Sequence, residues 1–443
     1  MIYIGKPYVI SDEYNAYLKA KIEITSDTAG KWMDLELPKA YWRLYEDYPP
    51  ASWDETGELY FKVDKEYEKY LCDDRADCFV VAFLYYAMMT GSDIKSEAPV
   101  SEKLLFGIEN HLFPALLKEN KGYKKINVYS ESIKTPYQTE NKVATGMSCG
   151  VDSLYSLKKY NQNNIPEQYR LTHLTYFNMG SIFHPNMAEN KQYHMDEFYR
   201  LTDEMSKDKM INAKNVADKV NMPLVYIESN IDKDYYRGGF GYTAVYRNCA
   251  MVLALQGLFG KYYCSSAGWP DFFELNLEGG SEHYETLLCS VFSNGTVEFI
   301  ISDYASRFEK TKELADYDIA KEYLDVCYNF NSCGKCSKCK RTLLTIDVLG
   351  KIDAFGKIFD IVNFKANRTD AYLWLLKAKG GSATNDAAIF AREIYEKANA
   401  KGIIPEEAFK EYNKEISKHK LLRVKHIPKI IIKKILTKFH LYK

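Results

Sequence analysis

The spacing of apolar residues changes along the chain and divides it into three regions. In the first region, apolar and polar positions alternate over Tyr17–Thr25 and Glu58–Val63, which predicts half-buried strands. The continuous apolar run Ala76–Met89 has the length and composition of a buried helix. Residues 1–140 are therefore predicted to form an N-terminal α+β accessory domain.

Between residues 141 and 350, short apolar runs alternate with longer amphipathic segments. The predicted strands are Leu171–Phe177, Leu224–Ile227, Tyr262–Ser265 and Val297–Ile301, and the predicted helices are Met195–Val220, Thr243–Leu258 and a segment near Glu282–Val291. This alternation indicates an α/β fold, a parallel sheet with helices on both faces. Ligands of such sheets bind beyond the carboxyl ends of the strands.

The third region, residues 351–443, is predicted to be helical. Four helices are expected, at Asp353–Phe364, Thr369–Lys379, Asn385–Ala400 and Pro405–Lys418. The tail from Lys418 to Lys443 is basic, without Asp or Glu, and carries an apolar stripe. We interpret it as a solvated terminal helix, with contact to an anionic membrane surface or to RNA phosphates as the alternative.

Composition places the chain among soluble globular proteins. It has 443 residues, 46% of them hydrophobic and 27% charged, which is enough for two or three domains. The net charge of −1 gives no global attraction to nucleic acid or membrane. No secretory signal follows Met1, and no apolar run is long enough to span a bilayer, so a cytoplasmic location is expected. In that compartment the ten cysteines are not expected to form a disulfide framework.

A loop of small residues begins the second region. Lys142–Ala144 can end a strand, Gly146, Ser148 and Gly150 form a tight turn, and an amphipathic helix begins near Asp152. Such a loop points backbone N–H groups and the positive end of a helix at one spot, which favours a phosphate. The alternative is an ordinary strand-to-helix turn, with Ser148 or Asp152 capping the helix. The loop lacks the lysine of a Walker A motif.

Four clustered cysteines predict a metal site. Cys327, Cys333, Cys336 and Cys339 can supply four thiolates to a tetrahedral zinc ion, which leaves no open position, so the site is predicted to be structural. Lys335, Lys338 and Lys340 would offset the negative charge of such a centre. A redox dithiol and an iron–sulfur cluster are the alternatives.

Both motifs carry a family resemblance. Ser148-Cys149-Gly150-Val151-Asp152-Ser153 resembles the Ser-Gly-Gly-x-Asp-Ser loop of the PP-loop ATP pyrophosphatases, with Cys149 in place of the first glycine. We expect a Cβ at that position to fit only if φ is negative. Together with the downstream cysteines, the loop resembles the QueC 7-cyano-7-deazaguanine synthase family over roughly the middle half of the chain. The extra flanking regions look more like enlarged QueC-like proteins of bacterial anti-phage operons, whose acceptor can be a protein terminus.

The resemblance implies a fold like that of the adenine nucleotide α-hydrolases and an ATP-dependent ligase. Such an enzyme adenylates a small, deazaguanine-like carboxylate, and ammonia or an amine then displaces AMP. The implied cofactors are ATP, Mg²⁺ and a structural Zn²⁺. The implied nucleotide-binding residues are Ser148, Cys149, Gly150, Val151, Asp152 and Ser153. An oligomer is compatible with this interpretation, and no nucleic acid or membrane partner is expected.

The resemblance implies catalytic roles for Asp152 and Ser153. Lys310 or Lys312, together with Arg247, would supply positive charge to the leaving pyrophosphate, and Asp271 would bind the substrate. Each residue also has a structural interpretation. Asp152 can cap a helix, Arg247 can pair with a neighbouring acid, and the lysines lie in a charged run where exposure is usual. Asp271 follows Pro270, as turn residues often do.

Two other functions remain open at this point. A PP-loop tRNA sulfurtransferase uses the same loop but also needs catalytic cysteines, and the chain has no basic surplus for tRNA. A non-catalytic nucleotide-binding scaffold on a decayed QueC-like fold is the other alternative.

Overall fold

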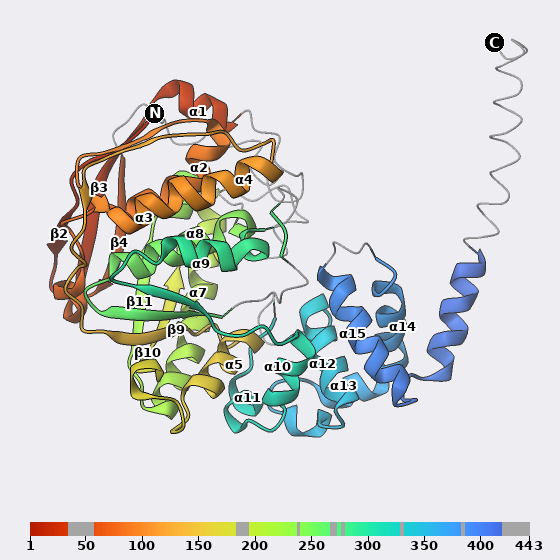
Figure 1. Ribbon diagram of the computed structural model, residues 1–443. Coiled ribbons are helices and arrows are strands. Elements are labelled where there is room, and N and C mark those ends of the chain that lie inside the picture. Colours follow the sequence, from red (N-terminus) through yellow and green to blue (C-terminus); the bar gives the residue numbers. More distant parts are fainter. Residues whose placement is uncertain are drawn as a thin grey trace, which may run out of the picture.

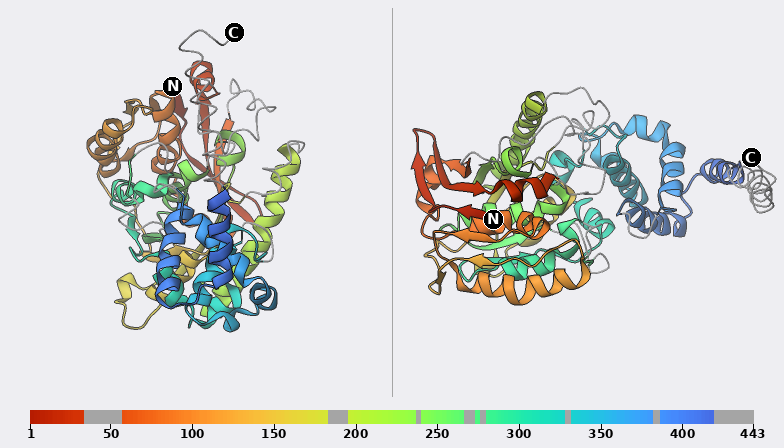
Figure 2. Two further views of the ribbon diagram at one scale, coloured as in Figure 1. Left: turned by 90° about the vertical axis from the view of Figure 1, so that its right-hand side faces the viewer. Right: turned by 90° about the horizontal axis from the view of Figure 1, so that it is seen from above.

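One sheet of eleven strands crosses the body of the protein and separates two layers of helices (Figure 1). The computed structural model describes residues 1–33, 57–182, 195–236, 240–265, 273–275, 280–327, 332–381 and 386–418. Seen from above, the C-terminal helices form a group beside this body (Figure 2). The expectation of a mixed α/β protein with a helical C-terminal region is confirmed.

Five neighbouring strands of the sheet are all parallel. They are β9 (Lys142–Gly146), β10 (His173–Asn178), β11 (Leu224–Ser229), β12 (Phe259–Cys264) and β13 (Glu298–Ile301). Their order across the sheet is β13-β12-β9-β10-β11. The chain therefore moves to one side of β9 through β10 and β11, and to the other side through β12 and β13. A topological switch point lies between β9 and β12, which is where open α/β sheets bind ligands.

Helices cover both faces of these strands, as the sequence predicts. On one face α8 (Phe240–Ala254) and α9 (Glu285–Phe292) pack with the sheet in a first hydrophobic core. On the other face α5 (Val151–Tyr160) and α7 (Met195–Val220) pack with it in a second hydrophobic core. Strand residues alternate between the two cores. In β11, Val225 and Ile227 belong to the first core, whereas Leu224 and Tyr226 pack against the second.

The N-terminal strands extend the same sheet. β4 (Gly57–Asp64) pairs with β11 in antiparallel orientation, and the order continues through β3 (Asn15–Ile24), β1 (Ile2–Ile4), β5 (Ile94–Ser96) and β7 (Val128–Tyr129), with β2 (Tyr8–Ser11) on β3. The domain boundary expected near residue 140 thus falls between two strands of one sheet. A separate small sheet joins β6 (Val100–Ser101) to β8 (Ser132–Ile133).

The helices of the N-terminal region are α1 (Ser26–Met33), α2 (Asp77–Thr90), α3 (Glu102–Gly107) and α4 (Phe113–Glu119). Every residue of α2 is buried, as its unbroken apolar sequence requires. It packs against α8, so the first hydrophobic core spans both sides of residue 140.

Helices α10 (Arg307–Leu314) and α11 (Asp318–Tyr323) lead from the sheet to the C-terminal helices. These are α12 (Ser337–Val348), α13 (Ile361–Ala366), α14 (Arg368–Ala378) and α15 (Asp386–Ala400), followed by a helix over 406–418. The single helix expected over Asp353–Phe364 is wrong. A short 3₁₀ turn, Ile352–Phe355, ends before Gly356, and α13 starts anew because the Asp360 side chain caps it. Residues 419–443 of the basic tail lie outside the described residues.

Candidate functional site

The loop between β9 and α5 leaves the first turn of the helix uncapped. Gly150 is the N-cap residue, and no side chain caps the helix there. The Ser148 Oγ atom instead lies 3.3 Å from the Ser153 Oγ atom. Among the described residues, none accepts a hydrogen bond from the N–H groups of Val151, Asp152 or Ser153. These three donors and the positive end of α5 therefore point at one place beside the switch point, which suits an anion.

Cys149 has a φ of +57°, in the left-handed region that glycine adopts easily. The Cβ is therefore accommodated at a positive φ, and our expectation that it fits only at a negative φ is wrong. This backbone conformation costs about 1–2 kcal/mol for a residue with a Cβ. Two contacts hold it. The Asp325 N–H donates to the Cys149 carbonyl oxygen at 2.8 Å, and the Cys149 side chain is fully buried in the second core. Burial, with the Asp325 carboxylate nearby, raises the pKa of the Cys149 thiol far above its usual range.

Asp152 is held between two cations from α10. Its carboxylate oxygens lie 2.8 Å from Arg307 Nη2 and 3.4 Å from Lys310 Nζ. Arg307 and Lys310 stand three residues apart on α10, on the face that packs against α5. The Lys310 side chain is only 2% exposed, so the alternative of surface exposure does not hold for it, whereas Lys312 is exposed. Two cations beside one carboxylate leave the start of α5 with an excess of positive charge.

The sequence did not single out Arg307. One local signal was present, because Ser306 and Glu309 form a capping box that fixes where α10 begins. The Ser306 cap places Arg307 in the first turn, one turn before Lys310. Its contact with Asp152 depends on how α10 packs on α5, which the sequence does not reveal.

Two more cations come from α12. Burial lowers the pKa of Lys338 to about 8, and the like charges of Arg341 and Arg307 act in the same direction. The Arg341 and Arg307 guanidinium groups lie 4.5 and 5.5 Å from the centre of the Phe390 ring on α15. We call Arg307, Lys310, Lys338 and Arg341 the cationic cluster. It extends the positive surroundings of Asp152 towards the C-terminal helices.

The four cysteines predicted to bind metal come together. The Sγ atoms of Cys327, Cys333, Cys336 and Cys339 all lie within 4.8 Å of one another. Backbone N–H groups point at three of these sulfur atoms at 3.3–3.4 Å, donated by Cys333, Cys336 and Cys339 to the preceding cysteine of the group. Gly334 has a φ of +65°, which the tight turn between the cysteines requires. Four thiol ligands with N–H donors behind them could hold zinc as a closed structural site.

The cysteine segment is attached to the loop between β9 and α5. Asp325, just before Cys327, donates its N–H to Cys149, and its carboxylate accepts from Lys209 Nζ of α7 at 2.6 Å. Lys209 Nζ also lies 3.4 Å from the Cys327 carbonyl oxygen. The Cys149 backbone and the first cysteine of the group therefore share one set of contacts.

Arg247 lies in the interior, at the carboxyl ends of β10 and β11. Its guanidinium is fully buried and donates to Asp232 Oδ1 at 2.7 Å and to the Met179 carbonyl oxygen at 2.8 Å, beside the Tyr236 ring. The pairing with a neighbouring acid, which was its structural interpretation, is thus present, and a catalytic role stays a prediction. Asp271 lies outside the described residues.

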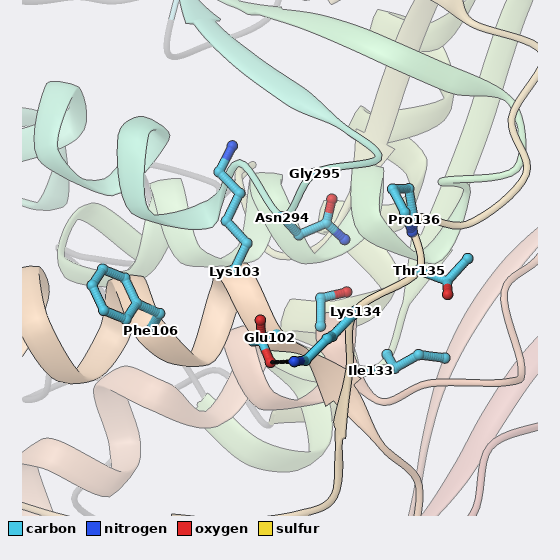
Figure 3. Close-up of a pocket in the computed structure, with 10 residues that line it drawn as sticks. Glu102, Lys103, Phe106, Ile133, Lys134, Thr135, Pro136, Asn294 and Gly295 are labelled. Atoms are coloured by element: carbon cyan, nitrogen blue, oxygen red, sulfur yellow. Dashed lines mark ion pairs between the residues drawn. The ribbon is translucent and has the colours of Figure 1, made fainter.

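A cavity of about 360 Å³ lies apart from this site, between α3, β8 and the turn after α9 (Figure 3). An ion pair between Glu102 and Lys134 crosses its edge. Behind it, Ser101 and Asn294 both donate to the fully buried Asp77 carboxylate. Its polar wall is therefore engaged in holding α2 to the rest of the fold, and none of the predicted site residues lines it.

Comparisons with family models, with curated proteins and with solved structures found no match to this chain. The geometry of the loop, the cationic cluster and the cysteines must therefore carry the functional argument. Among the described helices, none combines the length and apolar character needed to cross a membrane.

Proposed function

We propose that the chain is a QueC-like, ATP-dependent C–N ligase that activates a carboxylate as its adenylate and releases pyrophosphate. One observation carries this proposal. The uncapped start of α5 lies at the switch point of a parallel sheet, and Arg307 and Lys310 flank its only carboxylate, Asp152. The strand order and the loop support a fold like that of the adenine nucleotide α-hydrolases.

The N–H groups of residues 151–153 and the hydroxyls of Ser148 and Ser153 bind the β- and γ-phosphates of ATP. Arg307 and Lys310 supply positive charge where the pyrophosphate leaves. The substrate carboxylate oxygen forms a bond to the α-phosphorus as the bond from that phosphorus to the bridging oxygen of pyrophosphate breaks. Ammonia or an amine then attacks the acyl carbon, loses a proton, and displaces AMP.

Asp152 is the acidic side chain of the loop that can take part in holding Mg²⁺. This ion prefers one or two carboxylates together with phosphate oxygens, and it shields the charge on those oxygens when bound. Arg307 and Lys310, which pair with Asp152 here, would then turn to the phosphates. The four cysteines hold zinc in a structural role, and it takes no part in the reaction.

The test is an assay of purified protein with ATP, Mg²⁺ and 7-carboxy-7-deazaguanine, with and without ammonia, in which pyrophosphate and AMP are measured. Release that requires the carboxylate is the expected result. Asp152→Ala should abolish it, and Arg307→Ala and Lys310→Met should each lower the rate by about 100-fold or more. Lys312→Ala is the matched control, because Lys312 is exposed on the same helix and should leave the rate unchanged.

Two results would contradict the proposal. Pyrophosphate release that needs tRNA would favour the sulfurtransferase alternative. If the protein binds ATP but releases no pyrophosphate, with either ammonia or a peptide amine as the acceptor, the result would favour a nucleotide-binding scaffold. Binding itself is measured as the rise in unfolding free energy with ATP, which reaches about 2.7 kcal/mol at a hundredfold excess over Kd.

A further inference from the structure

A second group of metal-ligating side chains lies in the first hydrophobic core, apart from the four cysteines discussed above. Cys264 ends strand β12, and Glu285 and Cys289 stand one turn apart on α9. Their ligand atoms all lie within 4.8 Å of one another, and the Sγ atoms of Cys264 and Cys289 are 3.3 Å apart. All three residues are buried, with at most 9% of their surface exposed.

A third thiol adjoins this group. Cys249 of α8 is fully buried and lies near Cys264 and Cys289. One strand and two helices that are distant in the sequence therefore bring three thiols close together. The separation of the Cys264 and Cys289 sulfur atoms is well beyond the roughly 2.05 Å of a disulfide, so the pair is not cross-linked.

The ordinary interpretation is a set of buried cysteines that act as small apolar side chains. That interpretation accounts for Cys72 and Cys78, which are buried outside any such group. It does not account for a carboxylate oxygen within 4.8 Å of both sulfur atoms, a position that apolar packing of cysteines does not require. Cysteine thiolates and carboxylates are both zinc ligands, and here they come from two elements, β12 and α9.

We propose that Cys264, Cys289 and Glu285 bind a second zinc ion, with the Cys249 thiol as the nearest candidate for the fourth position. On binding, the two thiols lose their protons to solvent and the carboxylate binds in its charged form, as metal coordination requires. This site is independent of the Cys327–Cys339 group and of any reaction with ATP.

An ion at this position, beside the switch point between β9 and β12, suits a structural role. Ser265 follows Cys264, and its hydroxyl lies 3.0 Å from Thr145 Oγ1 and 2.9 Å from Ser156 Oγ. Thr145 belongs to β9 and Ser156 to α5, the two elements that are joined by the loop of the candidate site. An ion bound to Cys264 would therefore hold α9 and the carboxyl end of β12 against the elements that carry the loop.

The experiment counts zinc in the purified full chain, under reducing conditions and without nucleotide, after dialysis against a weak chelator. Wild type should hold two zinc ions per chain. Cys264→Ser and Cys289→Ser should each hold one, as should Cys336→Ser, and Glu285→Gln should lose its second ion at a lower chelator concentration. Cys78→Ala is the matched control for the loss of a buried cysteine and should hold two.

Cobalt titration of the wild-type chain gives a second measurement that does not depend on whether a variant folds. Two binding steps are expected, each with thiolate-to-cobalt absorption. A wild-type chain that binds a single ion, lost entirely in Cys336→Ser, would overturn the proposal. So would a Cys264–Cys289 disulfide, found by mass spectrometry in protein that binds one ion. Neither count depends on ATP turnover, so failure of the proposed enzyme activity leaves the result unchanged.

Discussion

At residue 149 a buried thiol occupies a left-handed backbone position that glycine adopts most easily. The strain of this position is balanced by the hydrogen bond from Asp325 and by complete burial of the side chain. The conformation of the loop is thus maintained by packing and not by the residue type at position 149. The raised pKa keeps the Cys149 thiol protonated at neutral pH, so it is unsuited to act as a nucleophile.

We predict that Cys149→Gly leaves the free energy of unfolding within about 1 kcal/mol of wild type. Relief of about 1–2 kcal/mol of backbone strain offsets the loss of a small buried side chain. Cys149→Val should destabilise the chain by at least about 2 kcal/mol, because a β-branched residue fits this φ poorly. Urea unfolding of the three proteins measures both effects. Equal losses for the two variants would show that the strain is unimportant.

A second prediction concerns His173, at the start of β10. Burial, with Lys142 nearby, lowers the pKa of His173 from 6.5 to about 4. The unfolded chain therefore binds more protons than the folded chain between these values, and the His173 contribution to stability is lost as pH falls from about 6.5 to 4.

His173→Gln should accordingly reduce the loss of unfolding free energy between pH 7 and pH 5, by on the order of 1 kcal/mol. Urea unfolding at the two pH values measures it. The comparison with wild type removes the effect of all other titrating groups. A variant with the same pH dependence as wild type would exclude His173 as a source of acid sensitivity.

Motifs whose residues lie close together in the sequence could be predicted, whereas contacts between residues distant in the sequence could not. The loop at 148–153 and the four cysteines were predictable because each motif is local and its residues have few other uses. Arg307 and Asp152 are distant in the sequence, and only the packing of α10 on α5 brings them together. The conformation of Cys149 likewise depends on Asp325, which belongs to another part of the chain.

At the scale of elements, the segment between α11 and α12 connects the cysteines to the loop between β9 and α5. It begins with the contacts of Asp325 and ends where the Cys336 sulfur caps α12. The same helix carries Lys338 and Arg341 of the cationic cluster. Metal bound to the four cysteines would therefore fix both the Cys149 backbone and two cations without contact with the nucleotide.

Cys336→Ser is expected to lose this metal, to lower the melting temperature by several degrees, and to weaken ATP binding by about tenfold or more. Calorimetric titration with ATP in the absence of any acceptor measures the binding. Cys72→Ala, a buried cysteine outside both groups, is the control. Unchanged ATP affinity after loss of the metal would show that the segment does not position the loop.

Elements with strong periodicity were predicted well. The strands β10 to β13 and the helix α2 lie where the apolar pattern places them, because burial on both sides leaves a clear run of apolar residues. The pattern failed at Asp353–Phe364, where apolar residues at helical spacing cover a turn. There, local capping by Asp360 decides the structure.

At the scale of the whole molecule, the N-terminal strands and the parallel strands form one sheet and share one core. β4 pairs with β11, and α2 packs against α8. No pattern in the sequence indicates this pairing, because an edge strand looks the same whether it pairs with its own domain or with another. A separate N-terminal domain was therefore the natural expectation.

We predict that residues 141–443 expressed alone are insoluble or lack fixed packing. Removal of residues 1–140 would expose the apolar face of α8 and the free edge of β11. Solubility and near-ultraviolet circular dichroism measure the outcome. Co-expression of residues 1–140 as a separate chain should restore both. A soluble fragment with a cooperative unfolding transition would show that the two parts fold independently.

The continuous sheet also limits one route to self-association, the pairing of exposed strand edges. Its long strands, β3 with ten residues and β4 with eight, lie inside the sheet. In the part of the chain that the structure describes, the outermost strands are β13, with four residues, β7, with two, and β2, with four, which pairs only with β3. Little unpaired backbone is therefore offered to a second chain. Short outermost strands hinder the strand-to-strand growth that leads to fibrils, so the width of this sheet does not by itself favour such growth.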